Sequence, residues 1–228
     1  MRKVSIIMPV KNEENFILSS IKRLRDNEPL LPAEIIVVDG GSQDRTVELA
    51  QKSADQVILS SKGGRSFQMH LGAQQAKEDV LIFLHADSKL PPNWQNILIR
   101  FFIENHHPPA AAAFSLAFDS DRLFFQTIAA MANWRSKFTK IPHGDQALIV
   151  SKDNYFRCGG FPDVPLMEEY IFVPRLRRLG RIDIYPETVT TSARKYIAKG
   201  PLKNAVKNSL LIFLFFMGVS PKQLAKWY

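Results

Sequence analysis

The sequence predicts an α/β fold in which a mostly parallel central sheet is flanked by helices. Short apolar runs at 4–8, 34–38 and 80–84 are typical of buried strands. The first two runs are separated by a segment in which Ile17 and Ile21 have helical spacing, so the three pieces form a β-α-β unit with parallel strands. The chain has 228 residues, of which 46% are apolar and 23% charged. These values fit one soluble α/β domain and exclude a disordered chain or a polytopic membrane protein.

The rest of the chain continues the alternation of helices and strands. We expect further strands over 57–59, 110–118, 147–150 and 182–185, in addition to the strand 80–84. Helices are expected between them over 46–50, 67–76, Pro92 to Phe102 and 123–134. A last helix before the strand 182–185 would begin near Glu168 and be capped by Gly180. Residues 1–196 would form the domain, and residues 197–228 a basic and apolar C-terminal helical segment.

Charge and cysteine content narrow the class of partner and the compartment. The formal net charge is +8 and the pI about 9.6, which favours anionic partners such as phosphorylated substrates or membrane surfaces. We expect no nucleic-acid partner, because no known module is present and the basic residues are not gathered in one short block. Cys158 is the only cysteine, and the chain runs from Met1 straight into a strand. Both features predict a cytoplasmic location.

The end of the strand 80–84 is the first candidate site. His85-Ala86-Asp87 follows this strand at the position where open α/β sheets collect ligands. Asp87 offers oxygen ligands for Mg²⁺ or Mn²⁺, and His85 offers an imidazole on the same side of an extended chain. The alternative is that Asp87 caps the next turn and His85 is a structural histidine.

Two further segments suit a nucleotide. Asp39 ends the strand 34–38 and can accept hydrogen bonds from a base or ribose, unless it only caps the following turn. Lys62-Gly63-Gly64-Arg65 precedes a helix, where a phosphate can bind. A Walker loop and a GxGxxG motif are both absent from the sequence, which disfavours ATP hydrolysis and Rossmann-type NAD binding.

A pair of acids and a polar loop lie in the second half of the chain. Glu168 and Glu169 begin a helix, where they either favour its dipole or supply a general base whose pKa is raised by the neighbouring carboxylate. The loop 142–146, with His143 and Asp145, is dense in polar groups.

Taken together, these motifs resemble family 2 glycosyltransferases of the GT-A fold. The resemblance covers most of residues 1–195 and rests on the order and spacing of four segments: Pro9–Glu14, Val37–Asp44, the strand into His85-Ala86-Asp87, and Met167-Glu168-Glu169. The segments Gly64–Met69, Gly144–Gln146 and Thr191–Tyr196 resemble a small bacterial branch of this family whose acceptors are mostly undefined.

The resemblance implies an inverting, metal-assisted transfer of a sugar from a UDP- or GDP-sugar to an unidentified acceptor hydroxyl. It implies that Pro9, Glu13 and Asp39 line the base and ribose and that Arg65 reaches the donor. His85-Ala86-Asp87 stands in place of the family's Asp-x-Asp triplet, with Asp87 and His85 as the metal ligands.

The resemblance also assigns the base and the charged groups around it. Glu169 stands where the family usually has an aspartate that acts as general base, and Glu168 precedes it. The candidates for contact with the acceptor or the diphosphate are His143, Asp145, Arg178 and Arg194, and Arg177 is a further diphosphate candidate. The alternative for the three arginines is that they form a solvated basic face.

Two other functions stay open. A nucleotidyltransferase would use a similar sheet. It would, however, require a glycine-rich basic loop directly after the first strand, where residues 9–14 are acidic and contain no glycine. A non-catalytic protein that binds a nucleotide sugar or a membrane surface stays open because His85 and Glu169 depart from the usual acids.

The C-terminal segment has two interpretations. Lys199, Lys203 and Lys207 have helical spacing and precede the apolar run 210–219, which is too short to span a bilayer. The segment could lie on the inner face of an anionic membrane near a lipid-linked acceptor, with contact through residues 199–219. It could equally dock on the domain or on a second subunit.

Overall fold

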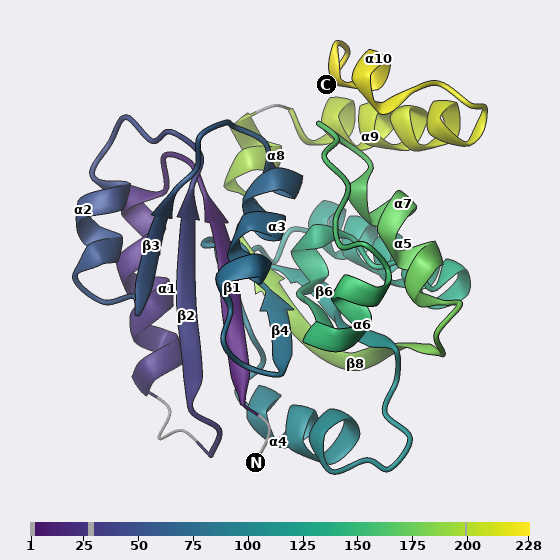
Figure 1. The fold of residues 1–228 in the computed structure, drawn as a ribbon. Coiled ribbons are helices and arrows are strands. Elements are labelled where there is room, and N and C mark those ends of the chain that lie inside the picture. The colour runs from purple at the N-terminus through teal and green to yellow at the C-terminus, as the bar shows by residue number, and fades with distance from the viewer. Residues whose placement is uncertain (1–2, 27–29, 199) are drawn as a thin grey trace.

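The computed structural model describes residues 3–26, 30–198 and 200–228. In this described part, eight strands form one sheet in the order β3-β2-β1-β4-β7-β6-β8-β5 (Figure 1). The strands are β1 (Val4–Val10), β2 (Ala33–Asp39), β3 (Gln56–Leu59), β4 (Val80–Phe83), β5 (Ser88–Lys89), β6 (Ala111–Phe118), β7 (Leu148–Ser151) and β8 (Ile182–Thr191). The predicted α/β class is confirmed.

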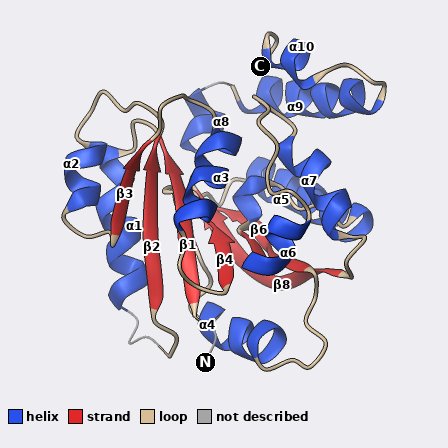
Figure 2. Cartoon of the chain, viewed as in Figure 1, coloured by secondary structure: helices blue, strands red, loops and turns tan. Residues whose placement is uncertain are grey.

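Helices cover both faces of this sheet (Figure 2). They are α1 (Glu14–Asp26), α2 (Thr46–Gln51), α3 (Arg65–Gln75), α4 (Trp94–Leu98), α5 (Leu123–Thr139), α6 (Lys152–Arg157), α7 (Glu168–Leu176), α8 (Arg194–Ala198), α9 (Pro201–Phe216) and α10 (Pro221–Ala225), with a π-helical turn η1 (Ile99–Ile103) and a 3₁₀ turn η2 (Gly144–Gln146). Successive residues of a strand point to opposite faces, so Ile6 packs in the core with α1 and α4, and Ile7 in the core with α3 and α7.

The direction of the strands decides which loops meet. β3, β2, β1 and β4 are parallel neighbours, so their carboxyl ends lie at one edge. β7 is antiparallel to β4, with Leu148 opposite Phe83. The loop that precedes β7, including η2, therefore reaches the same edge as the carboxyl end of β4.

Several predicted boundaries are wrong. β8 continues past Tyr185 to Thr191, because it pairs along β6 beyond an irregularity at Phe114/Ser115. α7 ends at Leu176 rather than near Gly180, and Gly180 does not adopt the left-handed conformation of a C-cap. The helix predicted to run to Phe102 changes to a π-helical turn after Leu98.

Helices α6 and α8 and the last five residues of α5 were not predicted. α6 begins where the Ser151 hydroxyl accepts a hydrogen bond from the Asn154 backbone N–H, a cap that sequence analysis overlooked. α5 continues five residues beyond Trp134. Pro29 and Pro32 predict the end of the helix that precedes them. Pro29 lies outside the described residues, as does Lys199.

The C-terminal helices α9 and α10 lie at the end of the molecule to which the parallel strands point (Figure 1). Leu211 of α9 and Leu224 of α10 are buried in the core of the domain. The opposite face of α9 is exposed and apolar, with Leu202, Val206, Leu210 and Phe213 spaced along one side. Within the described ranges, no helix is both long and apolar enough to cross a bilayer. The segment thus docks on the domain and also presents an apolar face to solvent.

Candidate active site

A cavity of about 380 Å³ opens at the carboxyl edge of the parallel strands. It is bounded by the ends of β1 and β4, the start of α3, η2, the start of α7, the segment after β8, and α9. Eight residues selected from the sequence line it, namely Pro9, Glu13, Arg65, His85, Asp87, His143, Asp145 and Glu169. A cavity of this size at this place in an open α/β sheet suits a small-molecule ligand.

The segments after β1 and β2 are joined by hydrogen bonds that backbone N–H groups donate to side-chain hydroxyls. The Asn12 N–H donates to Ser42 Oγ at 2.8 Å, and the Glu13 N–H donates to Thr46 Oγ1 at 2.8 Å. Asn12 has a φ of 55°, a left-handed conformation that asparagine tolerates. These bonds hold the Glu13 backbone and leave its carboxylate facing the cavity.

Asp87 is a buried carboxylate held by two cations. Its side chain is 4% exposed, and its Oδ2 lies 3.0 Å from Lys195 Nζ and 3.5 Å from an Arg194 guanidinium nitrogen. Burial by itself would raise the pKa of Asp87, but the charge of Lys195 and the groups around it outweigh burial and lower that pKa. Asp87 is therefore ionised at neutral pH.

His85 is a neutral, half-buried imidazole beside this carboxylate. Burial, followed by the positive charge of Arg65, lowers the pKa of His85 to about 3. Its Nε2 is buried and has no hydrogen-bond partner among the residues that the structure describes. An unpartnered buried nitrogen with a free lone pair can accept a hydrogen bond or a metal ion.

Glu13 completes a charged cluster with the two cations that hold Asp87. Lys195 Nζ lies 2.8 Å from Glu13 Oε1, and the Arg194 guanidinium donates to Glu13 Oε2. Arg194 also stacks on the Phe16 ring, with its guanidinium carbon 3.9 Å from the ring centre. This cluster, defined by Glu13, Asp87, Arg194 and Lys195, contains two carboxylates and two cations.

Across the cavity, Glu168 and Glu169 share the guanidinium of Arg65. Arg65 lies 2.7 Å from Glu168 Oε1 and 3.2 Å from Glu169 Oε1. Burial, followed by the negative charge of Glu168, raises the pKa of Glu169 to about 7, although Arg65 acts in the opposite direction. A carboxylate with this pKa can accept a proton at neutral pH and release it again.

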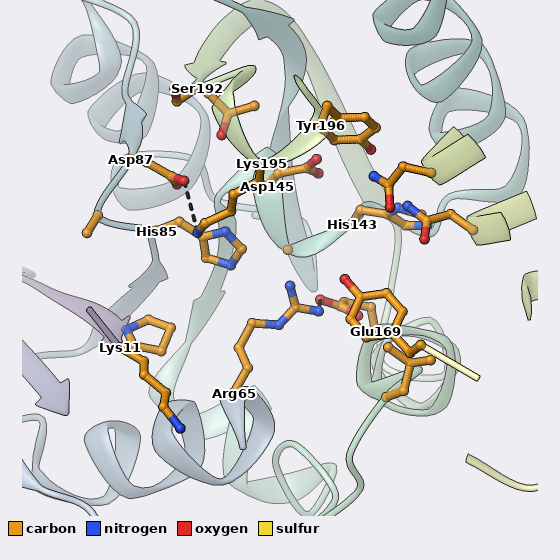
Figure 3. A pocket seen from close by; sticks show the side chains of 18 of the residues that line it. Lys11, Arg65, His85, Asp87, His143, Asp145, Glu169, Ser192, Lys195 and Tyr196 are labelled. Carbon is orange, nitrogen blue, oxygen red and sulfur yellow. Dashed lines mark hydrogen bonds and ion pairs between the residues drawn. The ribbon is translucent and has the colours of Figure 1, made fainter. Parts of the chain in front are cut away.

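Gly144 marks the point around which these groups converge. A methyl group added to it would lie 2.7 Å from Glu169 Oε1, 3.2 Å from an Arg65 guanidinium nitrogen and 3.3 Å from His85 Nε2. Figure 3 shows Arg65 and His85 lying between Asp87 and Glu169. The structure thus brings the candidate base Glu169 and the candidate metal ligand His85 to one small volume, which a larger residue at position 144 would fill.

The η2 loop adds two half-buried polar side chains, His143 and Asp145. His143 Nε2 lies 2.6 Å from the Tyr170 hydroxyl, and burial, aided by Arg135 and Arg65, lowers the pKa of His143 well below its usual value. Burial raises the pKa of Asp145, and one of its oxygens is buried with no partner in the described part of the chain. Both residues line the cavity, so they are placed to bind a polar ligand group.

Four predicted site residues are not among those that line the cavity, namely Asp39, Glu168, Arg178 and Arg194, although Glu168 contacts Arg65 and Arg194 contacts Glu13. The Asp39 carboxylate accepts hydrogen bonds from the Gly41 and Ser42 backbone N–H groups at 2.9 and 3.0 Å, which is the capping role that sequence analysis left as its alternative. Arg178 is exposed in the turn after α7, at the end remote from Glu169.

Sequence analysis missed Lys195, Tyr196 and the α9 residues Asn204 and Asn208, which also line the cavity. The segment Thr191–Tyr196 contributes to the family resemblance, but its residues by themselves do not indicate that Lys195 would reach Asp87.

Comparisons with known proteins identify a family and relatives of this chain. The profile of the family described as "Glycosyl transferase family 2" matches residues 5–162. An undecaprenyl-phosphate 4-deoxy-4-formamido-L-arabinose transferase of Yersinia enterocolitica is 32% identical over 142 residues, which are 58% of this chain and 42% of that protein. A 4,4'-diaponeurosporenoate glycosyltransferase of Staphylococcus haemolyticus is 33% identical over 96 residues, 39% of this chain and 25% of that protein. The chain thus spans less than half the length of these relatives.

Solved structures show the same fold. Glucosyl-3-phosphoglycerate synthase from Mycobacterium tuberculosis, in complex with Mn²⁺, UDP and glucosyl-3-phosphoglycerate, superimposes with a TM-score of 0.60 at 19% identity, over 82% of this chain and 70% of that one. S. aureus TarS 1–349 in complex with UDP-GlcNAc superimposes with a TM-score of 0.63 at 16% identity, over 83% of this chain and 58% of that one. The predicted GT-A fold is confirmed.

Proposed function

The chain belongs to glycosyl transferase family 2, and from this membership we propose that it transfers a sugar from a nucleoside-diphosphate sugar to an acceptor hydroxyl with inversion at the anomeric carbon. One observation carries the proposal. Glu169, with a pKa raised to about 7, and Asp87, an ionised buried carboxylate, lie in the same cavity with His85 and Arg65 between them. A base and a cation-binding acid in one cavity are what an in-line displacement requires.

In the proposed reaction, the acceptor oxygen attacks the anomeric carbon while its proton passes to Glu169. A bond forms between that oxygen and the anomeric carbon, and the bond from this carbon to the diphosphate oxygen breaks, with the electron pair leaving on the diphosphate. Because attack and departure occur on opposite faces, the configuration at the carbon inverts. Arg65 holds Glu169 in place, since its guanidinium contacts both Glu168 and Glu169.

The residues present fit a divalent cation, Mg²⁺ or Mn²⁺. The buried Asp87 carboxylate and the unpartnered His85 Nε2 would hold it, and among the described residues no third acid, histidine or cysteine joins them. Further ligands would come from the diphosphate and water, as is usual for Mg²⁺ in phosphate sites. When bound, such an ion neutralises the charge that develops on the leaving diphosphate. Arg194 and Lys195 lie beside the same position.

A titration tests the donor class. We expect UDP or GDP to bind in the presence of Mn²⁺ and much more weakly without it, because the protein offers few metal ligands of its own. The measurement is isothermal calorimetry with each nucleotide, followed by donor hydrolysis with the matching nucleotide sugar. Binding without hydrolysis or transfer to any acceptor would support the non-catalytic alternative. Absence of nucleotide binding in every condition would refute the proposal.

The acceptor that we propose is lipid-linked and is reached at a membrane surface. The named relatives act on undecaprenyl phosphate and on diaponeurosporenoate, both of them lipids. α9 lines the cavity with Asn204 and Asn208 and exposes Leu202, Leu210 and Phe213 on its other side. A helix with this arrangement can lie in the membrane interface and bring the cavity to a lipid headgroup.

Charge and aromatic residues around α9 support the same orientation. Lys203, Lys222 and Lys226 are exposed on or after this helix, and Trp227 is 57% exposed. Lysines are attracted to anionic headgroups, and tryptophan favours the membrane–water interface.

We expect the double substitution Leu210→Glu and Phe213→Glu to reduce binding to anionic vesicles by at least about tenfold. Each exposed apolar side chain contributes about 1.5–3 kcal/mol when buried in an apolar environment, and tenfold corresponds to about 1.4 kcal/mol. The measurement is flotation with vesicles of phosphatidylcholine and phosphatidylglycerol in equal parts. The matched control is Leu30→Glu with Leu59→Glu, which adds the same charge at exposed leucines elsewhere. Equal loss in both proteins, or no flotation of the unsubstituted protein, would contradict membrane docking through α9.

A further inference from the structure

We propose that Lys195 is a tethered cation that occupies the metal position at Asp87 until donor and metal arrive together, so that metal binding depends on the nucleotide. This inference rests on the proposed function for the identity of the site. It assigns to Lys195 a positioning role that the family membership does not supply.

The Lys195 ammonium lies where a metal ion at Asp87 would bind. Its Nζ lies 3.0 Å from Asp87 Oδ2 and 2.8 Å from Glu13 Oε1, so it bridges the two carboxylates that face this side of the cavity. Figure 3 shows the ammonium at Asp87 beside the His85 ring. A divalent ion held by Asp87 and His85 would compete with the ammonium for this space, because Lys195 already lies against Asp87 Oδ2, beside the His85 ring. The two modes of binding therefore exclude each other.

The charges around Lys195 indicate that a metal ion needs the nucleotide in order to bind. The cluster of Glu13, Asp87, Arg194 and Lys195 has two negative and two positive charges, and the positive Arg65 lies across the cavity. A divalent cation that enters alone would add two positive charges to a neutral cluster in a partly buried site, which is unfavourable. A nucleoside diphosphate brings the negative charge that the added cation requires. Metal and nucleotide are thus expected to bind cooperatively.

The position of Lys195 in the chain allows it to withdraw. It lies in the short helix α8, directly after the end of β8, and its side chain is 57% exposed, whereas that of Asp87 is 4% exposed. The ammonium can therefore leave Asp87 for solvent or for the arriving diphosphate without disturbing the core. Asp87 cannot move in the same way, so the lysine is the mobile member of the pair.

The test is calorimetric titration of Mn²⁺ alone into the unsubstituted protein and into Lys195→Met. We expect Lys195→Met to bind Mn²⁺ at least about tenfold more tightly, since the competing cation is removed and Asp87 is left with an unmatched charge. Lys52→Met is the matched control, because it removes one lysine charge at an exposed ion pair with Glu48, far from the cavity. Lys195→Arg should retain the exclusion, because it keeps a cation at this position.

A second titration measures the coupling directly. We expect UDP or GDP, whichever binds, to increase Mn²⁺ affinity strongly in the unsubstituted protein and only weakly in Lys195→Met. Equal Mn²⁺ affinity in the unsubstituted protein, Lys195→Met and Lys52→Met, with Lys195→Met still folded by circular dichroism, would overturn the inference. This result is distinct from failure of the proposed function, because it concerns Mn²⁺ binding without nucleotide, and sugar transfer is not measured.

Discussion

Replacing Glu169 by glutamine should reduce sugar transfer by on the order of 10²–10⁴-fold, which is the usual contribution of a positioned general base. Glutamine keeps the size of the side chain and its contact with Arg65 but cannot accept the acceptor's proton. Donor binding should persist, because Glu169 faces the cavity from α7 while the candidate donor ligands Glu13 and Asp87 lie at the ends of β1 and β4. The measurement compares initial transfer or donor-hydrolysis rates with the calorimetric affinity for the nucleotide. Loss of both quantities together would mean that Glu169 maintains the cavity rather than acting as a base.

The same residue predicts the pH dependence of the reaction. Glu169 is active when deprotonated, and its pKa is raised to about 7. Activity should therefore be half-maximal near this pKa, approach its maximum about one pH unit above it, and decline as the pH falls below it. Glu168→Gln should move the decline to lower pH, because it removes the neighbouring negative charge that raises the pKa of Glu169. A profile that stays flat from pH 5 to pH 8 in the unsubstituted protein would contradict the assignment of the base.

Asp87→Asn should cause the second large loss. The substitution removes the negative charge that would hold the cation at the leaving group, a contribution of several kcal/mol to the transition state. We expect transfer to fall by on the order of 10³-fold, and the dependence of nucleotide binding on Mn²⁺ to disappear. The measurement is nucleotide affinity with and without Mn²⁺, together with the rate at saturating donor.

Asp163→Asn is the matched control for this substitution. Asp163 pairs with Lys62, but its side chain is 65% exposed and does not line the cavity. It should leave both rate and affinity unchanged. If Asp87→Asn kept the metal dependence of nucleotide binding, the cation would have to be held elsewhere, and the proposed role of Asp87 would be wrong.

The sequence by itself determined the parts of this protein that depend on local pattern. The apolar runs of β1, β2 and β4 and the helical spacing of α1 were readable because burial of a strand or of one helix face imposes a short period on the residues concerned. Because parallel strands end at a common edge of the sheet, the sequence also predicts that Glu13 and Asp87 lie near each other, and both line the cavity.

The tertiary structure decided what depends on residues far apart in the chain. The antiparallel direction of β7, set by pairing with β4 and β6, moved the η2 loop with His143 and Asp145 to the carboxyl edge of β4. Because β8 extends along β6, Lys195 lies beside Asp87 and Glu13. Glu13 and Lys195 are 182 residues apart in the sequence. Arg65 meets Glu168 across 103 residues. No local period encodes such encounters, because strand pairing and ion pairs across the cavity are selected only when the whole chain packs.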